Sequence, residues 1–289
     1  MDRDNIYNRG DEKITTREGI SCVTYSVFDD LGFIKHGFAL RSGGVSKGCY
    51  ESLNLSFTRG DVKEDVDENF RRVAKFFGET PDNMVSAYQT HTADVMRVTI
   101  QDAGCGVTRE RLYPDVDALI TDDPGLMLTT SHADCTPIFL VDPVRRAIGM
   151  VHSGWKGTLG RIAANTVNAM RAEFSTDPQD IIAAIGPCIC GNCYEIGADV
   201  AAMFISRYGS LTSFSEVNGT GAMLRPLENG KFLLNQKAVN VRVLTNVGVR
   251  RENITVSGLC TFERDNLFFS HRKMGEKRGN LRGFIEISK

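Results

Sequence analysis

The sequence predicts a fold of the α/β class, α+β type, in which mixed β-sheets with antiparallel hairpins are covered by helices. Short apolar runs rich in β-branched and aromatic residues recur along the chain, as is typical of buried strands. Segments with helical periodicity are fewer, and no tandem repeat or low-complexity linker marks a domain boundary. We therefore expect a disordered polar segment at residues 1–15 and a single folded domain at 16–289.

Eight segments have the length and the apolar content of a buried strand. In chain order, the expected strands are 22–28, 117–122, 126–132, 136–143, 147–153, 181–187, 254–258 and 267–271.

Four segments are expected to be helical. In 64–77 the apolar side chains recur on one helical face, and Gly78 is a favourable C-terminal stop. The others are expected after Gly160, at about 197–208, and from Asn235, a favourable N-cap, to Gly248.

Composition excludes several functional classes. The chain has 289 residues and a formal net charge of −2 without a block of like charge, which argues against a nucleic-acid partner. The N-terminus lacks the apolar core of a signal peptide, and no stretch approaches the roughly 18 apolar residues of a membrane span. We expect a cytoplasmic protein whose eight cysteines are reduced thiols, available for metal binding or catalysis.

Residues 130–137, TSHADCTP, place three chemically active side chains between two apolar runs. His132, Asp134 and Cys135 stand at this junction, where packing alone does not require them. Buried polar groups cost free energy unless they find partners. The cluster is therefore either a hydrogen-bonded turn at a strand end or part of a site that does chemistry.

Two further histidines stand in similar contexts, His91 in AYQTHTADV and His152 in GMVHSGWKG. Together with the Cys135 thiolate, their imidazoles would give Zn²⁺ three protein ligands and leave a fourth position open, as in catalytic zinc sites. The spacing forms no compact motif, so hydrogen-bonded histidines at strand ends remain the alternative.

The segment GMVHSGWKGTLGRI reads as a strand, a glycine-rich turn and a helix. Amides at such a helix start, with Lys156 beside them, could hold an anion, although the glycines could equally serve only the tight turn.

A cysteine-rich segment, CICGNC, stands at 188–193. With Cys260 as a fourth ligand it could bind zinc or an iron–sulfur cluster, but a further pair at the usual spacing is missing.

Taken in order, several segments resemble one known family. They are HGFALRSGGVSKGCYESLNL, YQTHTADV, DALITD, SHADCTPIFLVDP, GMVHSGWKGTLGRI, IGPCICGNCYEIG and CTFERDNLFFSHRKMGEKRGN. They are similar to the YfiH/PgeF family, also called the multicopper polyphenol oxidoreductase (laccase) or purine nucleoside phosphorylase family. The resemblance covers nearly all of the chain after about residue 20 and implies that 16–289 is one YfiH-like catalytic domain.

The resemblance implies a zinc site made of His91 from Q-x-H, Cys135 from HADC and His152 from H-x-G-W. It implies phosphorolysis of adenosine, inosine, guanosine or methylthioadenosine, and deamination of adenosine; a bacterial branch is linked to peptidoglycan editing. The chain departs from the family pattern in reading NCYE for CCYE. It also has His271 where an aromatic residue often stands, with an insertion before Arg278.

The two nucleoside reactions ask for different residues. Deamination needs a proton shuttle, for which His132 and Asp134 are the nearest candidates while Cys135 remains a ligand. Phosphorolysis needs an oxyanion pocket beside the ribose. The expected substrate-binding residues are Arg41, Asn54, Gln89, Lys156 and Arg278.

Other readings of the same residues remain open. The family's laccase label implies phenol oxidation with copper, and copper could replace zinc at the His₂Cys site, but five histidines are too few to hold several copper ions. Cys135 could instead be the nucleophile of a cysteine hydrolase acting on a cell-wall precursor, with His132 or His152 as base. In a third reading the metal is structural and the protein is a binding or scaffolding partner.

Overall fold

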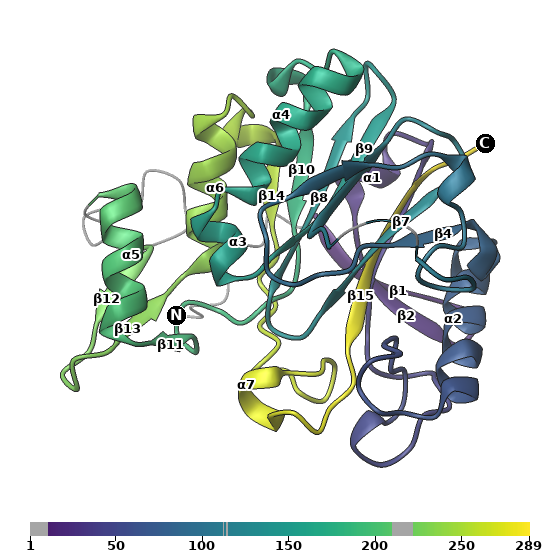
Figure 1. The fold of residues 1–289 in the computed structure, drawn as a ribbon, viewed down its shortest axis with the longest axis horizontal. Coiled ribbons are helices and arrows are strands. Elements are labelled where there is room, and N and C mark those ends of the chain that lie inside the picture. The colour runs from purple at the N-terminus through teal and green to yellow at the C-terminus, as the bar shows by residue number, and fades with distance from the viewer. Residues whose placement is uncertain (1–10, 112, 114, 210–221) are drawn as a thin grey trace.

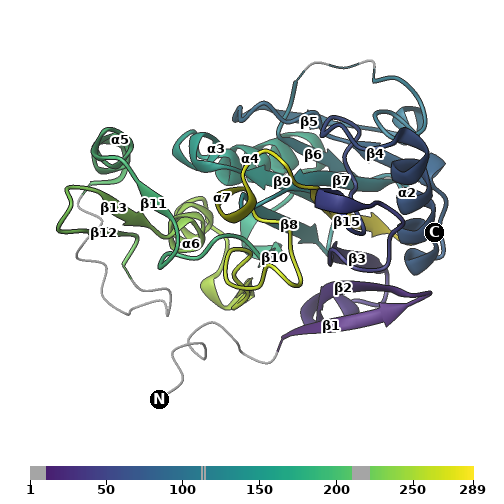
Figure 2. The same ribbon diagram turned by 90° about the horizontal axis from the view of Figure 1, so that it is seen from below.

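The computed structural model describes residues 11–111, 113, 115–209 and 222–289. Most of its strands form two six-stranded sheets, sheet A and sheet B, and three more form a small sheet at one end of the molecule (Figures 1 and 2).

Sheet A has the strand order β1-β2-β3-β15-β7-β4, and its neighbours are antiparallel except for the parallel pair β4–β7. Its strands are β1 (Glu12–Arg17), β2 (Ile20–Tyr25), β3 (Ile34–Ala39), β15 (Leu281–Ile287), β7 (Met127–His132) and β4 (Met84–Ser86).

Sheet B has the order β14-β10-β8-β9-β6-β5, with parallel pairs at its two edges and antiparallel pairs between them. Its strands are β14 (Ile254–Val256), β10 (Ile182–Ile185), β8 (Thr136–Asp142), β9 (Ala147–Ser153), β6 (Ala118–Thr121) and β5 (Val95–Arg97). The small antiparallel sheet consists of β11 (Glu195–Ile196), β13 (Phe232–Leu234) and β12 (Leu224–Pro226).

The helices are α1 (Ser26–Asp29), α2 (Lys63–Phe77), α3 (Trp155–Leu159), α4 (Ile162–Phe174), α5 (Ala198–Tyr208), α6 (Gln236–Asn246) and α7 (His271–Met274). Helix α2 packs on the outer face of sheet A, and α4 and α6 cover the outer face of sheet B (Figure 2). Within the described ranges, no helix has the length and apolar character needed to cross a membrane.

The core follows from alternation along the central strands. In β8, Ile138 and Leu140 pack toward the helices, whereas Phe139 and Val141 pack into the layer between the two sheets. Every residue of β8 is buried, because both faces of sheet B are covered. The result is a sandwich of helix, sheet, sheet and helix.

Most expected elements are confirmed. Six of the expected strands contain β6, β7, β8, β9, β10 or β14, a seventh overlaps β2 at residues 22–25, and the four expected helices match α2, α4, α5 and α6. Gly78 is the left-handed C-cap of α2, with φ +71°, and the Asn235 side chain caps α6 by accepting from the amide of Ala238.

Three expectations are wrong. Residues 26–28, expected at the end of a strand, lie in helix α1. Residues 267–271 form no strand: Phe268 and Phe269 are buried in the core, but the backbone turns there and Ser270 caps α7. Residues 12–15 are not disordered, since they lie in β1, where Thr15 and Thr24 hydrogen bond across the ladder to β2. The rest of the expected disordered segment, 1–10, lies outside the described residues.

The connection between β7 and β8 passes from sheet A to sheet B, so TSHADCTP bridges the two sheets at one end of the sandwich. The sheets approach closely near β15, where a Cβ on Gly283 would lie 2.2 Å from the Met150 Cε of β9. A side chain at this position would require the ends of the Met150 and Phe139 side chains to move.

Glu286, fully buried in β15, makes stability depend on pH. Burial raises the pKa of this carboxyl to about 7 despite the Lys35 ammonium 3.2 Å away. The ordinary value is 4.5, so the unfolded chain loses the proton at a lower pH than the folded protein does. The contribution of protonated Glu286 to the free energy of unfolding is therefore complete below the ordinary glutamate pKa. It is lost as the pH rises through about 7.

We expect Glu286→Gln to raise the free energy of unfolding by about 2 kcal/mol above neutral pH and to change it little near the ordinary glutamate pKa. Denaturant unfolding over a pH series measures this, with the exposed Glu228→Gln as control. An equal gain at every pH would contradict the explanation.

Candidate metal centre and substrate cavity

Three side chains meet at the end of the sandwich where the chain passes between the sheets. Cys135 comes from the β7–β8 connection, His152 from the end of β9, and His91 from the loop between β4 and β5. Their ligand atoms all lie within 4.8 Å of one another, and His91 Nε2 is 3.8 Å from Cys135 Sγ. The trio expected from the sequence is therefore brought together as a possible metal-binding site.

A buried carboxylate, Asp117 at the start of β6, holds the two histidines in place. Its Oδ1 accepts from Nδ1 of His152 at 2.6 Å and from the His91 amide at 3.2 Å. Its Oδ2 accepts from the amides of Thr90 and Thr92 and from the Thr92 hydroxyl. Because Nδ1 of His152 donates to Asp117, its Nε2 is left to face Cys135.

The charges of the trio depend on one another. Burial favours a neutral thiol, but His152 and hydrogen bonds from His152 and His91 outweigh it and lower the pKa of Cys135 to about 6. Burial likewise opposes a charged His152, yet Cys135 and Asp117 raise its pKa to about 9. The site therefore holds a thiolate–imidazolium pair at neutral pH when it binds no metal.

The space around the trio fits a metal ion. Gly154 follows directly after β9, and a Cβ there would lie 2.6 Å from His91 Cδ2 and 3.2 Å from Cys135 Sγ. Any other residue would fill the space between the ligands. One thiolate and two imidazoles, one of them backed by a carboxylate, form a donor set suited to zinc or copper.

His132 and Asp134 point elsewhere. The Nδ1 of His132 donates to the carbonyl of Cys135 at 3.1 Å, and its Nε2 pairs with the Thr130 hydroxyl at 2.8 Å. Burial and then His152 lower its pKa, so the ring is neutral. Neither His132 nor Asp134 lines the cavity described below.

The Asp134 carboxylate connects the turn to the segment that follows β14. It accepts from the Thr261 hydroxyl at 2.6 Å, from the Ser270 hydroxyl at 3.0 Å and from the amide of Arg272 at 2.6 Å. The residue adopts φ +80°, which turns its side chain away from the metal ligands. These hydrogen bonds anchor the turn to the segment that follows β14.

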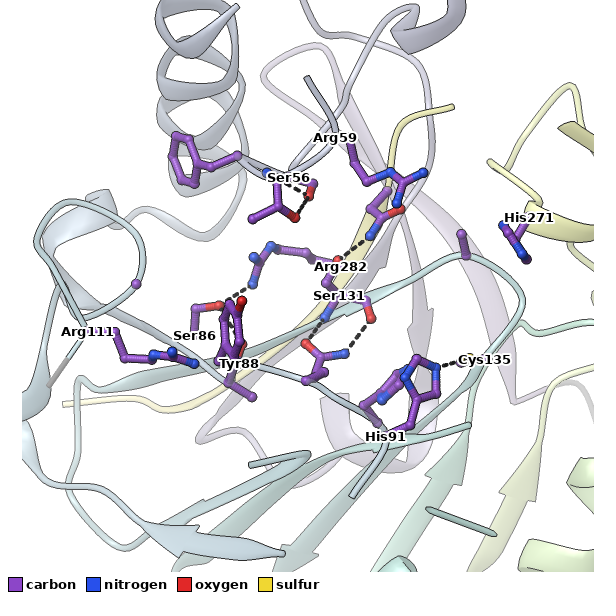
Figure 3. A pocket seen from close by; sticks show the side chains of 18 of the residues that line it. Ser56, Arg59, Ser86, Tyr88, His91, Arg111, Ser131, Cys135, His271 and Arg282 are labelled. Atoms are coloured by element: carbon purple, nitrogen blue, oxygen red, sulfur yellow. Dashed lines mark hydrogen bonds between the residues drawn. The ribbon is translucent and has the colours of Figure 1, made fainter. Parts of the chain in front are cut away.

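A cavity of about 700 Å³ opens beside the trio. In Figure 3, His91 and Cys135 lie at one side of it, whereas Ser86, Tyr88 and Arg111 lie at the other. The polar and charged residues of its wall are Ser56, Thr58, Arg59, Ser86, Tyr88, Gln89, His91, Glu110, Arg111, Ser131, Cys135, His152, His271, Glu276, Arg278, Asn280 and Arg282.

Two buried arginines in the cavity wall have no carboxylate ion-pair partner among the described residues. Arg282 bonds the carbonyl of Leu55 and the hydroxyl of Ser86, both neutral groups. Arg278 bonds the Gly279 carbonyl and the Asn280 side chain, and its Nε has no partner among the described residues. In the described part of the chain neither pairs with a carboxylate. Burial lowers the pKa of each to about 10, so both stay charged at neutral pH.

Of the substrate-binding residues expected from the sequence, Gln89 and Arg278 line the cavity and three do not. Arg41 donates to the carbonyls of Glu51 and Asp265 and lies over the Phe269 ring. Asn54 is fully buried and bonded to its neighbours, and Lys156 lies beside Trp155 on α3.

Sequence reasoning missed Asp117, Arg282, Arg59 and Tyr88. Asp117 carried a signal, since it is an acidic residue directly before the apolar run ALIT. Arg282 also interrupts an apolar run, which is typical of a buried charged residue with a specific role. Arg59 and Tyr88 lie in loops and gave no comparable signal.

The family model described as multi-copper polyphenol oxidoreductase laccase matches residues 35–288. The chain belongs to this family. One relative, named purine nucleoside phosphorylase YlmD from Bacillus subtilis, is 34% identical over 250 residues, which cover 86% of this chain and 87% of the relative.

Two solved structures of the family share the fold. YlmD from Geobacillus stearothermophilus superposes with a TM-score of 0.87 at 32% identity, covering 96% of this chain and 99% of its own. The hypothetical protein YfiH from Bacillus licheniformis gives 0.86 at 30% identity, covering 95% and 99%. The family and the fold class expected from the sequence are both confirmed.

The family's copper-oxidase description asks for more histidine ligands than gather here. His36 accepts from the Tyr25 amide in the core, His132 is used within the turn, and His271 contacts Arg278. Among the described residues only His91 and His152 join Cys135. The geometry supports a single metal ion bound by two histidines and one cysteine at this position.

The Asp117 contact predicts a change in metal affinity. Asp117→Asn should weaken binding of Zn²⁺ by about 10–100-fold, because the amide no longer fixes the His152 tautomer or its charge. Competition with a chromophoric chelator at neutral pH measures the affinity. The control is Asp122→Asn, a variant of the acidic residue that directly follows β6. It should bind Zn²⁺ as tightly as the wild type does. Equal affinities would contradict the assigned role.

Proposed function

We propose that the protein is a zinc-dependent purine nucleoside phosphorylase that acts in this cavity. The proposal rests on the composition of the cavity wall. His91, Cys135 and His152, the candidate metal ligands, line the same cavity as two buried arginines that lack a carboxylate partner. Uncompensated buried charge is costly, and a bound phosphate dianion would remove that cost. Relatives named purine nucleoside phosphorylase support a purine nucleoside and phosphate as the substrates.

In phosphorolysis, a phosphate oxygen forms a bond to C1′ of the ribose while the bond from C1′ to the purine nitrogen breaks. The electron pair leaves with the base, which takes up a proton, and the products are the free base and ribose 1-phosphate. Arg278 and Arg282 would hold the phosphate, with the hydroxyls of Ser86 and Ser131 on the same wall. Positioning of this anion against C1′ is the main contribution of the chain.

Tyr88 is the candidate platform for the base. It lines the cavity with 43% of its surface exposed, and the Arg111 guanidinium lies 3.5 Å from its ring centroid. An exposed ring of this kind can stack on a purine. Gln89 has a supporting role, because its side chain bonds both the amide and the carbonyl of Ser131 and so fixes the floor of the cavity.

His91, Cys135 and His152 would hold the zinc ion, with copper as the competing ion at the same ligands. When bound, zinc supplies a Lewis acid that polarises a substrate oxygen or nitrogen. Adenosine, inosine, guanosine and methylthioadenosine are the proposed substrates. Adenosine deamination is a proposed second activity of the same site.

A metal-defined turnover assay tests the proposal. Adenosine should give adenine and ribose 1-phosphate only when phosphate is present, and Cys135→Ala should lower this rate by roughly 100-fold or more because a metal ligand is lost. Chromatography separates the products, and Cys49→Ala, an exposed cysteine outside the site, is the control. Inosine formed without phosphate would favour deamination. No product from zinc-loaded protein would sink the nucleoside assignment.

The arginines predict a specific kinetic change. Arg278→Gln should raise the KM for phosphate by about tenfold to a hundredfold, because a charge-assisted hydrogen bond to the anion is lost, while the KM for nucleoside changes less. Lys156→Gln removes a cation that the structure keeps out of the cavity, so it is the matched control. A larger rise in the KM for phosphate in the Lys156 variant would contradict the arginine site. It would indicate instead that phosphate binds at the glycine-rich turn.

The thiolate–imidazolium pair favours a second candidate, a cysteine hydrolase in which Cys135 attacks the substrate and His152 shuttles the proton. Alkylation separates the two functions. A nucleophile would react fastest in metal-free protein and be protected by a cell-wall precursor. A zinc ligand would be protected by zinc and not by the precursor.

A further inference from the structure

A second group of metal-binding side chains lies outside the cavity wall. Cys190, Cys193, Cys260 and Glu263 place one ligand atom each in a cluster whose members are all within 4.8 Å of one another. Three thiols and a carboxylate at such distances, on segments about seventy residues apart in the chain, need an explanation beyond packing. All three cysteines are free thiols.

We propose that this cluster is a structural zinc site that fastens the turn at 188–193 to the segment at 258–264. The two segments already pair through their backbones. Cys188 and Cys260 form an isolated parallel β-bridge, and the Thr261 amide donates to the Cys188 carbonyl at 3.1 Å. Because these contacts fix the backbones, the four ligands are assembled by the fold before a metal arrives.

The distances fit tetrahedral coordination. Glu263 Oε1 lies 3.3 Å from Cys193 Sγ and 3.7 Å from Cys190 Sγ. A zinc ion with Zn–S near 2.3 Å and Zn–O near 2.1 Å sets sulfur and oxygen roughly 3.6 Å apart in a tetrahedron. Small movements of the Glu263 side chain, which is exposed, are enough to complete the geometry.

A backbone amide points at one of the sulfur atoms, as amides do around bound thiolates. The Cys190 amide donates to Cys260 Sγ at 3.3 Å. Such a donor offsets part of the negative charge that accumulates when several thiolates share one ion.

The ligand types select the metal. Three thiolates exclude Mg²⁺ and Ca²⁺, which take oxygen ligands, and favour a thiophilic ion. Four protein ligands leave no open position, which is the arrangement of a structural zinc site. Cys188 is not a ligand: it is fully buried, and its thiol contacts the Ile189 carbonyl. The three thiolate ligands are therefore Cys190 and Cys193, the C-x-x-C part of CICGNC, and Cys260.

The site would stabilise one wall of the substrate cavity. Thr261, next to Cys260, donates to Asp134 in the turn that carries Cys135. The same segment continues to His271 and Arg278, which line the cavity. Zinc at the cluster would therefore hold this wall against the β7–β8 turn without contacting substrate.

Metal content tests the proposal independently of any activity. Wild-type protein, purified with reductant from zinc-supplemented cells, should contain two zinc ions per chain by mass spectrometry. Cys193→Ser and Cys135→Ser should each contain one, and Cys135→Ser combined with Cys193→Ser should contain none. Cys49→Ser, an exposed thiol outside both clusters, should keep two. A second measurement is cobalt substitution, in which Cys135→Ser should retain the intense charge-transfer absorption of three thiolates.

Several results would overturn the site. One zinc in the wild type that Cys193→Ser leaves in place would do so, as would iron with acid-labile sulfide. A disulfide between two of Cys190, Cys193 and Cys260 in freshly reduced, zinc-supplemented protein would indicate a redox pair instead. Circular dichroism of each variant shows whether a lost ion reflects a lost ligand or an unfolded chain. A failure of the phosphorolysis assay leaves the zinc count unaffected, so the two proposals stand or fall separately.

Discussion

The geometry of the candidate metal centre depends on the buried carboxylate of Asp117. It accepts hydrogen bonds from five donors, among them the ring of His152 and the amide of His91. Burial would raise the pKa of this carboxyl, but the His152 ring and the Thr92 donors hold it below its usual value. One charged group thus sets the tautomer of one ligand, the backbone path of another and, through His152, the ionisation of Cys135.

The trio lies where the two sheets meet, because its members come from both. Cys135 stands in the connection that leaves sheet A and enters sheet B, His152 ends a central strand of sheet B, and His91 follows an edge strand of sheet A. The two buried arginines of the cavity come from β15 and the segment before it. Chemistry at a sheet end, with strands as the rigid support, is a common way to hold ligands precisely.

The sequence predicted the sheets, the main helices and the metal trio, since each depends on local patterns or on motifs that resemble a family. It could not separate the roles of His132, Asp134 and Cys135, because neighbours in a turn with φ +80° send their side chains in different directions. Local patterns also favoured Arg41 and Lys156, which lie outside the cavity wall, over Arg282, which lies in it. Arg41 and Lys156 stand in glycine-rich motifs, whereas Arg282 acts through long-range contacts to Leu55 and Ser86 that no local pattern records.

The close approach of the sheets at Gly283 links the core to the metal ligands. Gly283 pairs with Thr130 of β7, two residues before His132, and touches Met150 of β9, two residues before His152. A side chain added at 283 would have to displace the ends of Met150 on β9 and Phe139 on β8. Strand β9 ends beside His152, and β8 begins next to Cys135. Because protein cores are close-packed, the apolar layer between the sheets supports the same strand ends that carry two of the three candidate ligands.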